Sequence, residues 1–281
     1  MAGKKTGEKQ PTVSVIIGTF NSAPTLPACL SSVFAQKYKN IEAIIVDKGS
    51  TDSTLEIARS FPVRIIEGHV ERCTQWNAGA KIARGKFIYF LGADMETHQD
   101  FISEAVKKCL SSGASAIYTV VSTKSNAYWA RVRGFERKFY LLDEKWQAAR
   151  FIEKGVFWKI GGWNEKLVAG EDWDLQEKLN KGGFVTKSIG PYPDVHLDEP
   201  TSLPVICRKY YYYGSTLRKY FSEHGTKESV SKLQPMRGVF FLHPELFASN
   251  LSLVPGFFIY KAAQYSFSAM GYILGRHAAP Q

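Results

Sequence analysis

The sequence has little cysteine, and its four cysteines are too far apart to form a cluster. Cys29, Cys73, Cys109 and Cys207 show no CxxC spacing, which argues against a zinc site and against a disulfide framework. We therefore expect a reducing, cytoplasmic environment. A GxGxxG motif is also missing, which excludes the usual dinucleotide-binding fingerprint. The Lys-rich segment Met1–Gln10 lacks the apolar core of a signal peptide.

The sequence has fewer acidic than basic residues: it contains 26 Asp and Glu and 36 Lys and Arg, which gives a net charge of +10. Such a chain attracts anions, and nucleic acid, an anionic membrane surface and phosphorylated substrates all qualify. We find no zinc ligands, helix-turn-helix or RNP-like aromatic strand, so we expect no nucleic acid as a partner. A hydrophobic content of 44% indicates a globular chain behind a flexible basic N-terminus, residues 1–11.

Short apolar runs alternate with helical patterns along the first part of the chain. The runs predict strands at Val13–Ile17, Ile41–Val46, Val63–Glu67, Phe87–Leu91 and Ala116–Val121. Helical patterns predict helices near residues 22–36, 51–59, 72–83, 128–142, 171–181 and 203–221, and leave residues 148–158 undecided. The alternation predicts βαβ units, and hence an α/β fold with a mostly parallel central sheet flanked by helices.

Polar segments follow three of these strands. They are Gly18-Thr19-Phe20-Asn21, Asp47-Lys48-Gly49-Ser50-Thr51-Asp52 and Gly92-Ala93-Asp94. Because the carboxyl ends of parallel strands meet at one edge of the sheet, we expect these residues to share one cleft. Carboxylates and loop amides at such an edge suit a sugar nucleotide, whose diphosphate needs a divalent cation and backbone donors.

These segments, taken in order with several later ones, resemble the family 2 glycosyltransferases of the GT-A fold. The later segments are Glu71-Arg72, Gln75–Ala80, Ala83–Lys86, Gly161–Glu165 and Gly170–Leu175. Each piece alone is weak evidence, whereas the ordered set is specific. The resemblance covers residues 12–221 and implies a GT-A domain there, with a Rossmann-like nucleotide-binding half. It also implies an inverting transfer from a nucleoside diphosphate sugar.

The resemblance carries over roles for residues at the strand ends. It implies nucleotide contacts from Thr19, Asn21, Asp47, Gly49 and Ala93. An Asp at this point also suits a turn or a helix cap, so a structural role for Asp47 stays open. The ordinary turn is an equally good interpretation for Gly49.

The metal motif of the family departs from its pattern here. The family has Asp-x-Asp, whereas this sequence has Gly92-Ala93-Asp94, so the first carboxylate is missing. Asp94 matches the direct metal ligand, and His196 matches a position near the metal or the diphosphate. We expect a divalent cation, Mn²⁺ or Mg²⁺, with phosphate oxygens and water completing its ligands. Glu96 is an alternative second carboxylate, and the missing Asp leaves an impaired enzyme open.

An acidic pair supplies the expected catalytic group. Glu171 and Asp172 match the family's acidic pair, in which the second residue is the usual general base that accepts the acceptor's proton. Acidic residues in the first turn of a helix also have a purely structural explanation, because the helix dipole stabilises them. We further expect Arg150 and Arg208 to bind a phosphate of the donor or the acceptor.

The C-terminal residues 222–281 form a predicted helical extension. Leu251–Leu274 is long enough to cross a bilayer, but Lys261 near its middle argues for an interfacial or protein-packed helix. We expect this extension to associate with the membrane from the cytoplasmic side. A lipid-linked or polyprenyl-phosphate acceptor then follows as the partner of the sugar nucleotide.

Two other classes of protein compete with this interpretation. A catalytically silent protein that binds a sugar nucleotide or a lipid is compatible with Gly92. A nucleotidyltransferase needs a basic, Gly-rich loop after its first strand, and Gly18-Thr19-Phe20-Asn21-Ser22 has no Lys or Arg. We therefore expect a glycosyltransferase.

Overall fold

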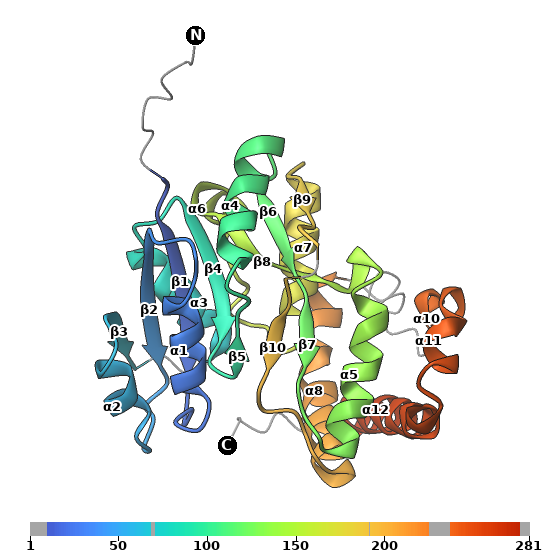
Figure 1. Ribbon diagram of the computed structural model, residues 1–281. Helices are drawn as coiled ribbons and strands as arrows, with labels where there is room; N and C mark the ends of the chain where they lie inside the picture. Colours follow the sequence, from blue (N-terminus) through green and yellow to red (C-terminus); the bar gives the residue numbers. More distant parts are fainter. Residues whose placement is uncertain (1–9, 69–70, 191, 225–236, 276–281) are drawn as a thin grey trace.

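A seven-stranded sheet forms the centre of the protein in the computed structural model, which describes residues 10–68, 71–190, 192–224 and 237–275. Its strand order is β3-β2-β1-β4-β8-β6-β9 (Figure 1). The strands are β1 (Val13–Thr19), β2 (Ile41–Asp47), β3 (Val63–Glu67), β4 (Phe87–Gly92), β6 (Ala116–Thr119), β8 (Ala148–Glu153) and β9 (Thr186–Lys187). Strands β1 to β4 pair in parallel, whereas β8 is antiparallel to both β4 and β6. The predicted α/β fold with a mostly parallel sheet is confirmed.

Helices cover both faces of this sheet. One face packs on α1 (Leu26–Phe34), α2 (Thr54–Arg59) and α4 (Phe101–Ser112). The other face packs on α3 (Arg72–Ile82), α6 (Lys154–Lys159) and α7 (Glu171–Lys181). Side chains of a strand alternate between faces, so Val15 and Ile17 enter the first core and Ile16 enters the second. Burial on both faces explains why the strands are continuous apolar runs.

A small second sheet connects the metal motif to the later part of the chain. Its order is β5-β10-β7, with β5 at Met95–Glu96, β10 at Asp194–His196 and β7 at Val121–Thr123. His196 pairs with Met95 in the antiparallel register of β10 and β5. This register brings His196 next to Asp94, which is 102 positions earlier in the sequence.

The remaining helices form a third core beside the sheet. They are α5 (Tyr128–Tyr140), α8 (Leu203–His224), α10 (Gly238–Leu242), α11 (Pro244–Ala248) and α12 (Val254–Leu274), with short 3-10 turns η1 (Glu144–Trp146) and η2 (Leu251–Leu253). Helix α12 lies directly against α8, and a Cβ on Gly214 would come within 2.0 Å of the Ser268 carbonyl oxygen. Glycine at this position is therefore required for the two backbones to approach.

Helix α12 is packed on the protein along one face. Phe257, Tyr260 and Lys261 are buried there, and Lys261 Nζ lies 2.8 Å from Glu136 Oε1 on α5. Of the helices in the described ranges, none combines the length and apolarity needed to cross a membrane. The expected helical extension is thus seen as helices over residues 238–274, and membrane association stays a prediction.

We expect Lys261→Met to lower the free energy of unfolding by about 3 kcal/mol, because it removes a charged partner from a buried carboxylate. Burial acts to raise the pKa of Glu136, but the charges of Arg133 and Lys261 outweigh it and hold that pKa below its ordinary 4.5. The stabilisation is therefore present above about pH 4.5 and is lost as the pH falls further. Urea unfolding at pH 7 and at pH 4 measures the difference.

The matched control is Lys138→Met, which removes an exposed lysine from the same helix as Glu136. We expect this control to change stability by less than about 0.5 kcal/mol. An equal effect of both substitutions would contradict a buried ion pair at Lys261.

Candidate active site

A cavity of about 1120 Å³ opens between the carboxyl edge of the sheet and helices α5, α8 and α12. Sequence-distant residues predicted to be functional line it together: Asn21, Ala93, Asp94, Arg150, Glu171, Asp172 and His196. The lining does not include Thr19, Asp47, Gly49 or Arg208. The edge of the sheet thus brings most of the predicted site into one space, as parallel strands require.

Asp47 lies behind the cavity wall and organises the loop after β2. Its Oδ1 accepts hydrogen bonds from Thr19 Oγ1 at 2.7 Å and Ser50 Oγ at 2.6 Å. Its Oδ2 accepts from the backbone N–H groups of Gly49 at 2.8 Å and Ser50 at 2.7 Å. These bonds outweigh the effect of burial and lower the pKa of Asp47. Both carboxylate oxygens of Asp47 therefore accept hydrogen bonds from residues of the loops. This is the structural role that the sequence left open. A nucleotide contact of Asp47 stays a prediction.

Asn21 joins the two loops that follow β1 and β2. Its backbone N–H donates to Ser50 Oγ at 2.9 Å, and its side-chain Oδ1 accepts from the Thr51 N–H at 2.9 Å. Its φ of +46° is a left-handed conformation that Asn tolerates better than most residues. Gln75 of α3 ties the same strand ends together by donating to the carbonyl oxygens of Thr19 and Val46. The loops at the nucleotide end are therefore held in place before any ligand binds.

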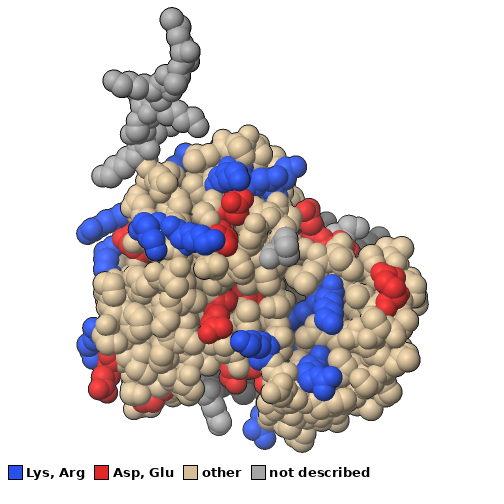
Figure 2. Space-filling model, in the orientation of Figure 1, with Lys and Arg blue, Asp and Glu red and all other residues tan. Residues whose placement is uncertain are grey.

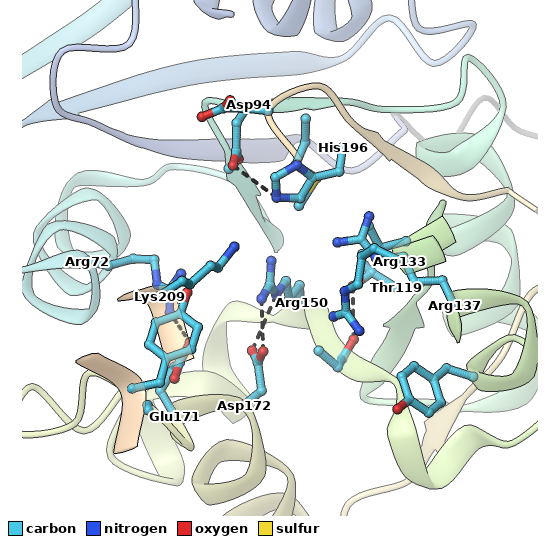
Figure 3. A pocket seen from close by; sticks show the side chains of 18 of the residues that line it. Arg72, Asp94, Thr119, Arg133, Arg137, Arg150, Glu171, Asp172, His196 and Lys209 are labelled. Atoms are coloured by element: carbon cyan, nitrogen blue, oxygen red, sulfur yellow. Dashed lines mark hydrogen bonds and ion pairs between the residues drawn. The ribbon is translucent and has the colours of Figure 1, made fainter. Parts of the chain in front are cut away.

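Asp94 and His196 face each other across one side of the cavity (Figure 3). His196 Nε2 lies 3.2 Å from Asp94 Oδ2, and His196 Nδ1 lies 3.8 Å from Glu199 Oε1. Burial lowers the pKa of His196, although Asp94 and Glu199 act to raise it. A neutral imidazole has a lone pair available for a metal ion.

This donor set suits a divalent cation in part. Asp94 and His196 would supply one oxygen and one nitrogen ligand, and Glu199 lies behind His196, where metal-binding histidines usually have a carboxylate partner. The described residues contain no cluster of three or more His, Cys, Asp or Glu side chains that could hold a metal. Phosphate oxygens of a donor and water therefore have to complete the ligands.

The space around position 92 is crowded, which suits a glycine in place of the first Asp of the motif. A Cβ at this position would lie 2.5 Å from Asp94 Oδ1 and 3.2 Å from Met95 Cγ. Any side chain at position 92 would force Asp94 away from its present position. Glu96, the alternative second carboxylate, is on β5 and outside the cavity lining.

Two ion pairs hold the acidic pair at the start of α7. Arg150 of β8 binds Asp172 with two hydrogen bonds, Nη2 to Oδ2 at 2.9 Å and Nε to Oδ1 at 3.3 Å. Arg72 of α3 pairs with Glu171. Figure 3 shows Arg150 between Asp172 and the Asp94–His196 pair. Each carboxylate is thus fixed by an arginine from a different element.

The two neighbouring carboxylates have pKa values shifted in opposite directions. Burial raises the pKa of Glu171 above its ordinary value, and the charge of Asp172 adds to this rise against the pull of Arg72. Burial also acts to raise the pKa of Asp172, but Arg150 outweighs it and the pKa of Asp172 is lowered. Asp172 is therefore ionised at neutral pH, and a carboxylate with two bound donors keeps lone pairs for a further hydrogen bond.

Arg208 does not share this site. It lies on the opposite side of α8, beside an apolar groove with Leu203, Cys207 and Phe267. The next residue, Lys209, lines the cavity instead. The sequence does not define which face of α8 points into the cavity, and a phosphate contact of Arg208 stays a prediction.

Sequence analysis gave no role to three further arginines that line the cavity: Arg133, Arg137 and Arg237. The only available signal was the Arg133 to Arg137 spacing of four, which puts both on one face of α5. Elsewhere, Figure 2 shows positive side chains in separate groups interspersed with acidic ones.

The fold and this cavity define a GT-A glycosyltransferase. A mannosyltransferase from Pyrobaculum calidifontis, solved with GDP-Man and Mn²⁺, superposes with a TM-score of 0.66 over 95% of this chain and 88% of its own at 16% identity. TarS of S. aureus, solved with UDP-GlcNAc, superposes with a TM-score of 0.54 over 93% of this chain and 90% of its own at 13% identity. At such low identity these likenesses show the shared fold.

Sequence comparison identifies the family. Residues 14–159 match the family described as Glycosyl transferase family 2, and the chain belongs to this family. A PGL/p-HBAD biosynthesis glycosyltransferase of Mycobacterium tuberculosis is 32% identical over 180 residues, which cover 59% of this chain and 68% of that protein. The predicted family and the predicted transferase activity with a nucleotide-sugar donor are confirmed.

Proposed function

We propose that the protein transfers a sugar from a nucleoside diphosphate sugar, with inversion, to a lipid-linked or polyprenyl-phosphate acceptor. The observation that carries this proposal is the Asp172 carboxylate, held by two hydrogen bonds from Arg150 in the same cavity as Asp94 and His196. A base on one side and diphosphate-binding groups on the other suit a direct displacement at the anomeric carbon. One displacement inverts that carbon.

The residues of the chain divide the work between them. Asn21 and Ala93 border the nucleotide at the edge of the sheet, and Asp94 and His196 would hold the divalent cation near the diphosphate. When bound, the cation supplies positive charge that stabilises the leaving diphosphate. Asp172 takes the proton of an acceptor hydroxyl as it attacks. If a phosphate oxygen attacks instead, no proton has to be removed and Asp172 orients the acceptor.

A set of exposed apolar side chains on the C-terminal helices supports a lipid acceptor. They lie on α10, η2 and α12 (Figure 1): Phe241, Leu242, Leu251, Phe258, Ile259, Ile273 and Leu274. Leu242 and Leu251 are 75% and 72% exposed. Arg218 donates to the carbonyl oxygens of Tyr272 and Ile273, which places a positive charge beside this set. Apolar residues next to basic ones suit the interface of an anionic membrane on its cytoplasmic side.

Ligand-induced thermal stabilisation tests the donor part of the proposal. UDP, GDP and their sugars are screened, each with and without Mn²⁺, because a ligand that binds only the folded state raises the melting temperature with its affinity. We expect one nucleotide to stabilise the chain and Mn²⁺ to increase the effect. If no nucleotide stabilises it under either condition, the donor assignment fails.

We expect the double substitution Leu242→Asp with Ile273→Asp to weaken binding to anionic vesicles by about tenfold or more, since it removes two apolar contacts and adds like charge. Flotation on phosphatidylglycerol vesicles measures the bound fraction. Leu110→Asp on α4 is the matched control, because Leu110 is 57% exposed but belongs to another part of the protein. A chain that never floats would remove the support for a membrane acceptor.

A further inference from the structure

One wall of the cavity consists mainly of arginine and aromatic side chains. We call it the distal wall, and it consists of Arg133, Arg137 and Tyr140 from α5, Trp146 from η1, Arg237 before α10, and Gln264 and Tyr265 from α12. Figure 3 shows Arg133 and Arg137 together on the side of the cavity opposite Arg72. Basic and aromatic side chains therefore face a space that the donor-binding edge does not occupy.

Ion pairs join basic and acidic side chains in and behind this wall. Among the described residues, the ion pairs of this wall join Arg133, Arg137 and Lys261 to two carboxylates, Glu136 and Glu199, and do not include Arg237; Asp198 is a further carboxylate of the cavity lining. Glu136 pairs with both Arg133 and Lys261, whereas Glu199 pairs with Arg137. A charge away from water is costly without a partner of opposite sign, and an anionic ligand would supply such a partner to a cation of this wall.

Arg133 and Arg137 act on each other as like charges. Burial lowers the pKa of Arg137 to about 10, and the nearby charge of Arg133 is the next cause. Arg137 is tied back by hydrogen bonds to Ser122 O at 3.0 Å and Thr123 Oγ1 at 2.7 Å, in addition to Glu199. Arg133 keeps 24% of its side chain exposed and is the more accessible of the two.

Arg237 is held flat against two aromatic rings. Its guanidinium carbon lies 3.6 Å from the ring centre of Trp146 and 4.7 Å from that of Tyr140. Its Nε is buried without a hydrogen-bond partner. No ion pair of Arg237 is seen among the described residues. Arg237 also lines the cavity, and a guanidinium held in place by stacking is suited to bind an anion there.

We propose that the distal wall is a second anion subsite, which binds a phosphate or diphosphate group of the acceptor apart from the donor's diphosphate. This inference rests on the proposed function and adds the class of acceptor, a hydroxyl nucleophile on a molecule that carries phosphate. The inference takes the hydroxyl case of the proposed function, in which Asp172, held by Arg150, accepts the proton of the attacking group. Arg133 and Arg237 then hold the acceptor's phosphate at a distance from the reacting atoms.

Calorimetry with inorganic pyrophosphate tests the subsite while the donor site is filled. The titration is done in metal-free buffer with saturating UDP or GDP, whichever stabilises the protein. We expect pyrophosphate to bind in the presence of the nucleotide. Arg133→Gln and Arg237→Gln should each weaken pyrophosphate binding by about tenfold or more, and leave nucleotide affinity within about twofold.

The controls separate this subsite from general charge and from folding. Arg131→Gln removes an exposed arginine of α5 that does not line the cavity, and it should leave pyrophosphate binding unchanged. In Arg133→Gln, Glu136 loses one of its two charged partners but keeps Lys261 and Tyr140. Unchanged nucleotide affinity reports that each variant is folded.

Farnesyl diphosphate identifies the source of the phosphate. If farnesyl diphosphate binds at least tenfold more tightly than pyrophosphate, and Arg133→Gln and Arg237→Gln weaken both ligands, the acceptor is a lipid phosphate. If the two ligands bind with equal affinity, the acceptor is a soluble phosphorylated molecule. No pyrophosphate binding beside the nucleotide, or nucleotide affinity that falls in the Arg133 and Arg237 variants, would overturn the subsite. Failure of the proposed function is a different result, namely no nucleotide binding in the unmodified chain.

Discussion

Asp172→Asn is expected to lower sugar transfer to a hydroxyl acceptor by a factor on the order of 10²–10⁴, the usual contribution of acid–base catalysis. Asn has the shape of Asp and keeps one oxygen to accept a hydrogen bond from Arg150, so the fold and donor binding should persist. It cannot accept the proton that the acceptor hydroxyl releases. The rate of transfer at saturating donor, measured with the donor that thermal stabilisation identifies, gives the effect.

Glu177→Gln is the matched control for this substitution. It changes a carboxylate of the same helix to its amide, and Glu177 pairs with Lys181 away from the cavity. We expect nearly full activity from the control. Near-normal turnover of Asp172→Asn would exclude Asp172 as the base, whereas activity kept only toward a phosphate acceptor would assign it the orienting role.

The second large effect concerns the metal motif. Asp94→Ala should weaken donor binding in the presence of Mn²⁺ by on the order of 100-fold, because it removes one of the two side chains that we propose hold the cation. Donor binding measured without metal should hardly change. Calorimetry with the donor, with and without Mn²⁺, separates the two contributions.

Glu96→Ala is informative as the comparison for Asp94→Ala. Glu96 is two positions further on, belongs to β5 and is absent from the cavity lining, so its loss should leave Mn²⁺-dependent binding intact. A loss equal to that of Asp94→Ala would mean that Glu96 is the second carboxylate. If Mn²⁺ does not change the donor affinity of the unmodified chain or of Asp94→Ala, this loop is not a metal site.

Four of the five predicted strands agree with the structure because each depends on a local pattern, whereas the run Ala116–Val121 divides into β6 and the start of β7, which belong to different sheets. The third strand, Val63–Glu67, was predicted with both ends correct, and the first continues two residues beyond Ile17. Helix α4, Phe101–Ser112, was missed, although Asp100 before it and Gly113 after it, with a φ of +67°, are ordinary helix boundaries. The undecided segment 148–158 divides into strand β8 and helix α6, a change of period too short to detect.

The candidate site was predictable only where residues follow a strand or open a helix. Asn21, Asp94 and the acidic pair Glu171-Asp172 line the cavity because the carboxyl edge of the sheet gathers them. The charges of these residues depend on partners that no local pattern reveals. Arg72 is 99 positions from Glu171, and Lys261 is 125 positions from Glu136.

The sequence by itself was enough to predict the α/β class, the family, and the candidate roles of the acidic pair and the metal motif. Strand periodicity and ordered motifs depend only on residues that are close together in the sequence. Only the tertiary structure decided that Asp47 supports a loop and that Lys209 rather than Arg208 faces the cavity. It also decided that Lys261 is buried against Glu136. Packing between distant segments decides which side of a helix is covered and which charges pair with each other. The free energy of each charged group depends on its burial, which exists only once the chain has packed.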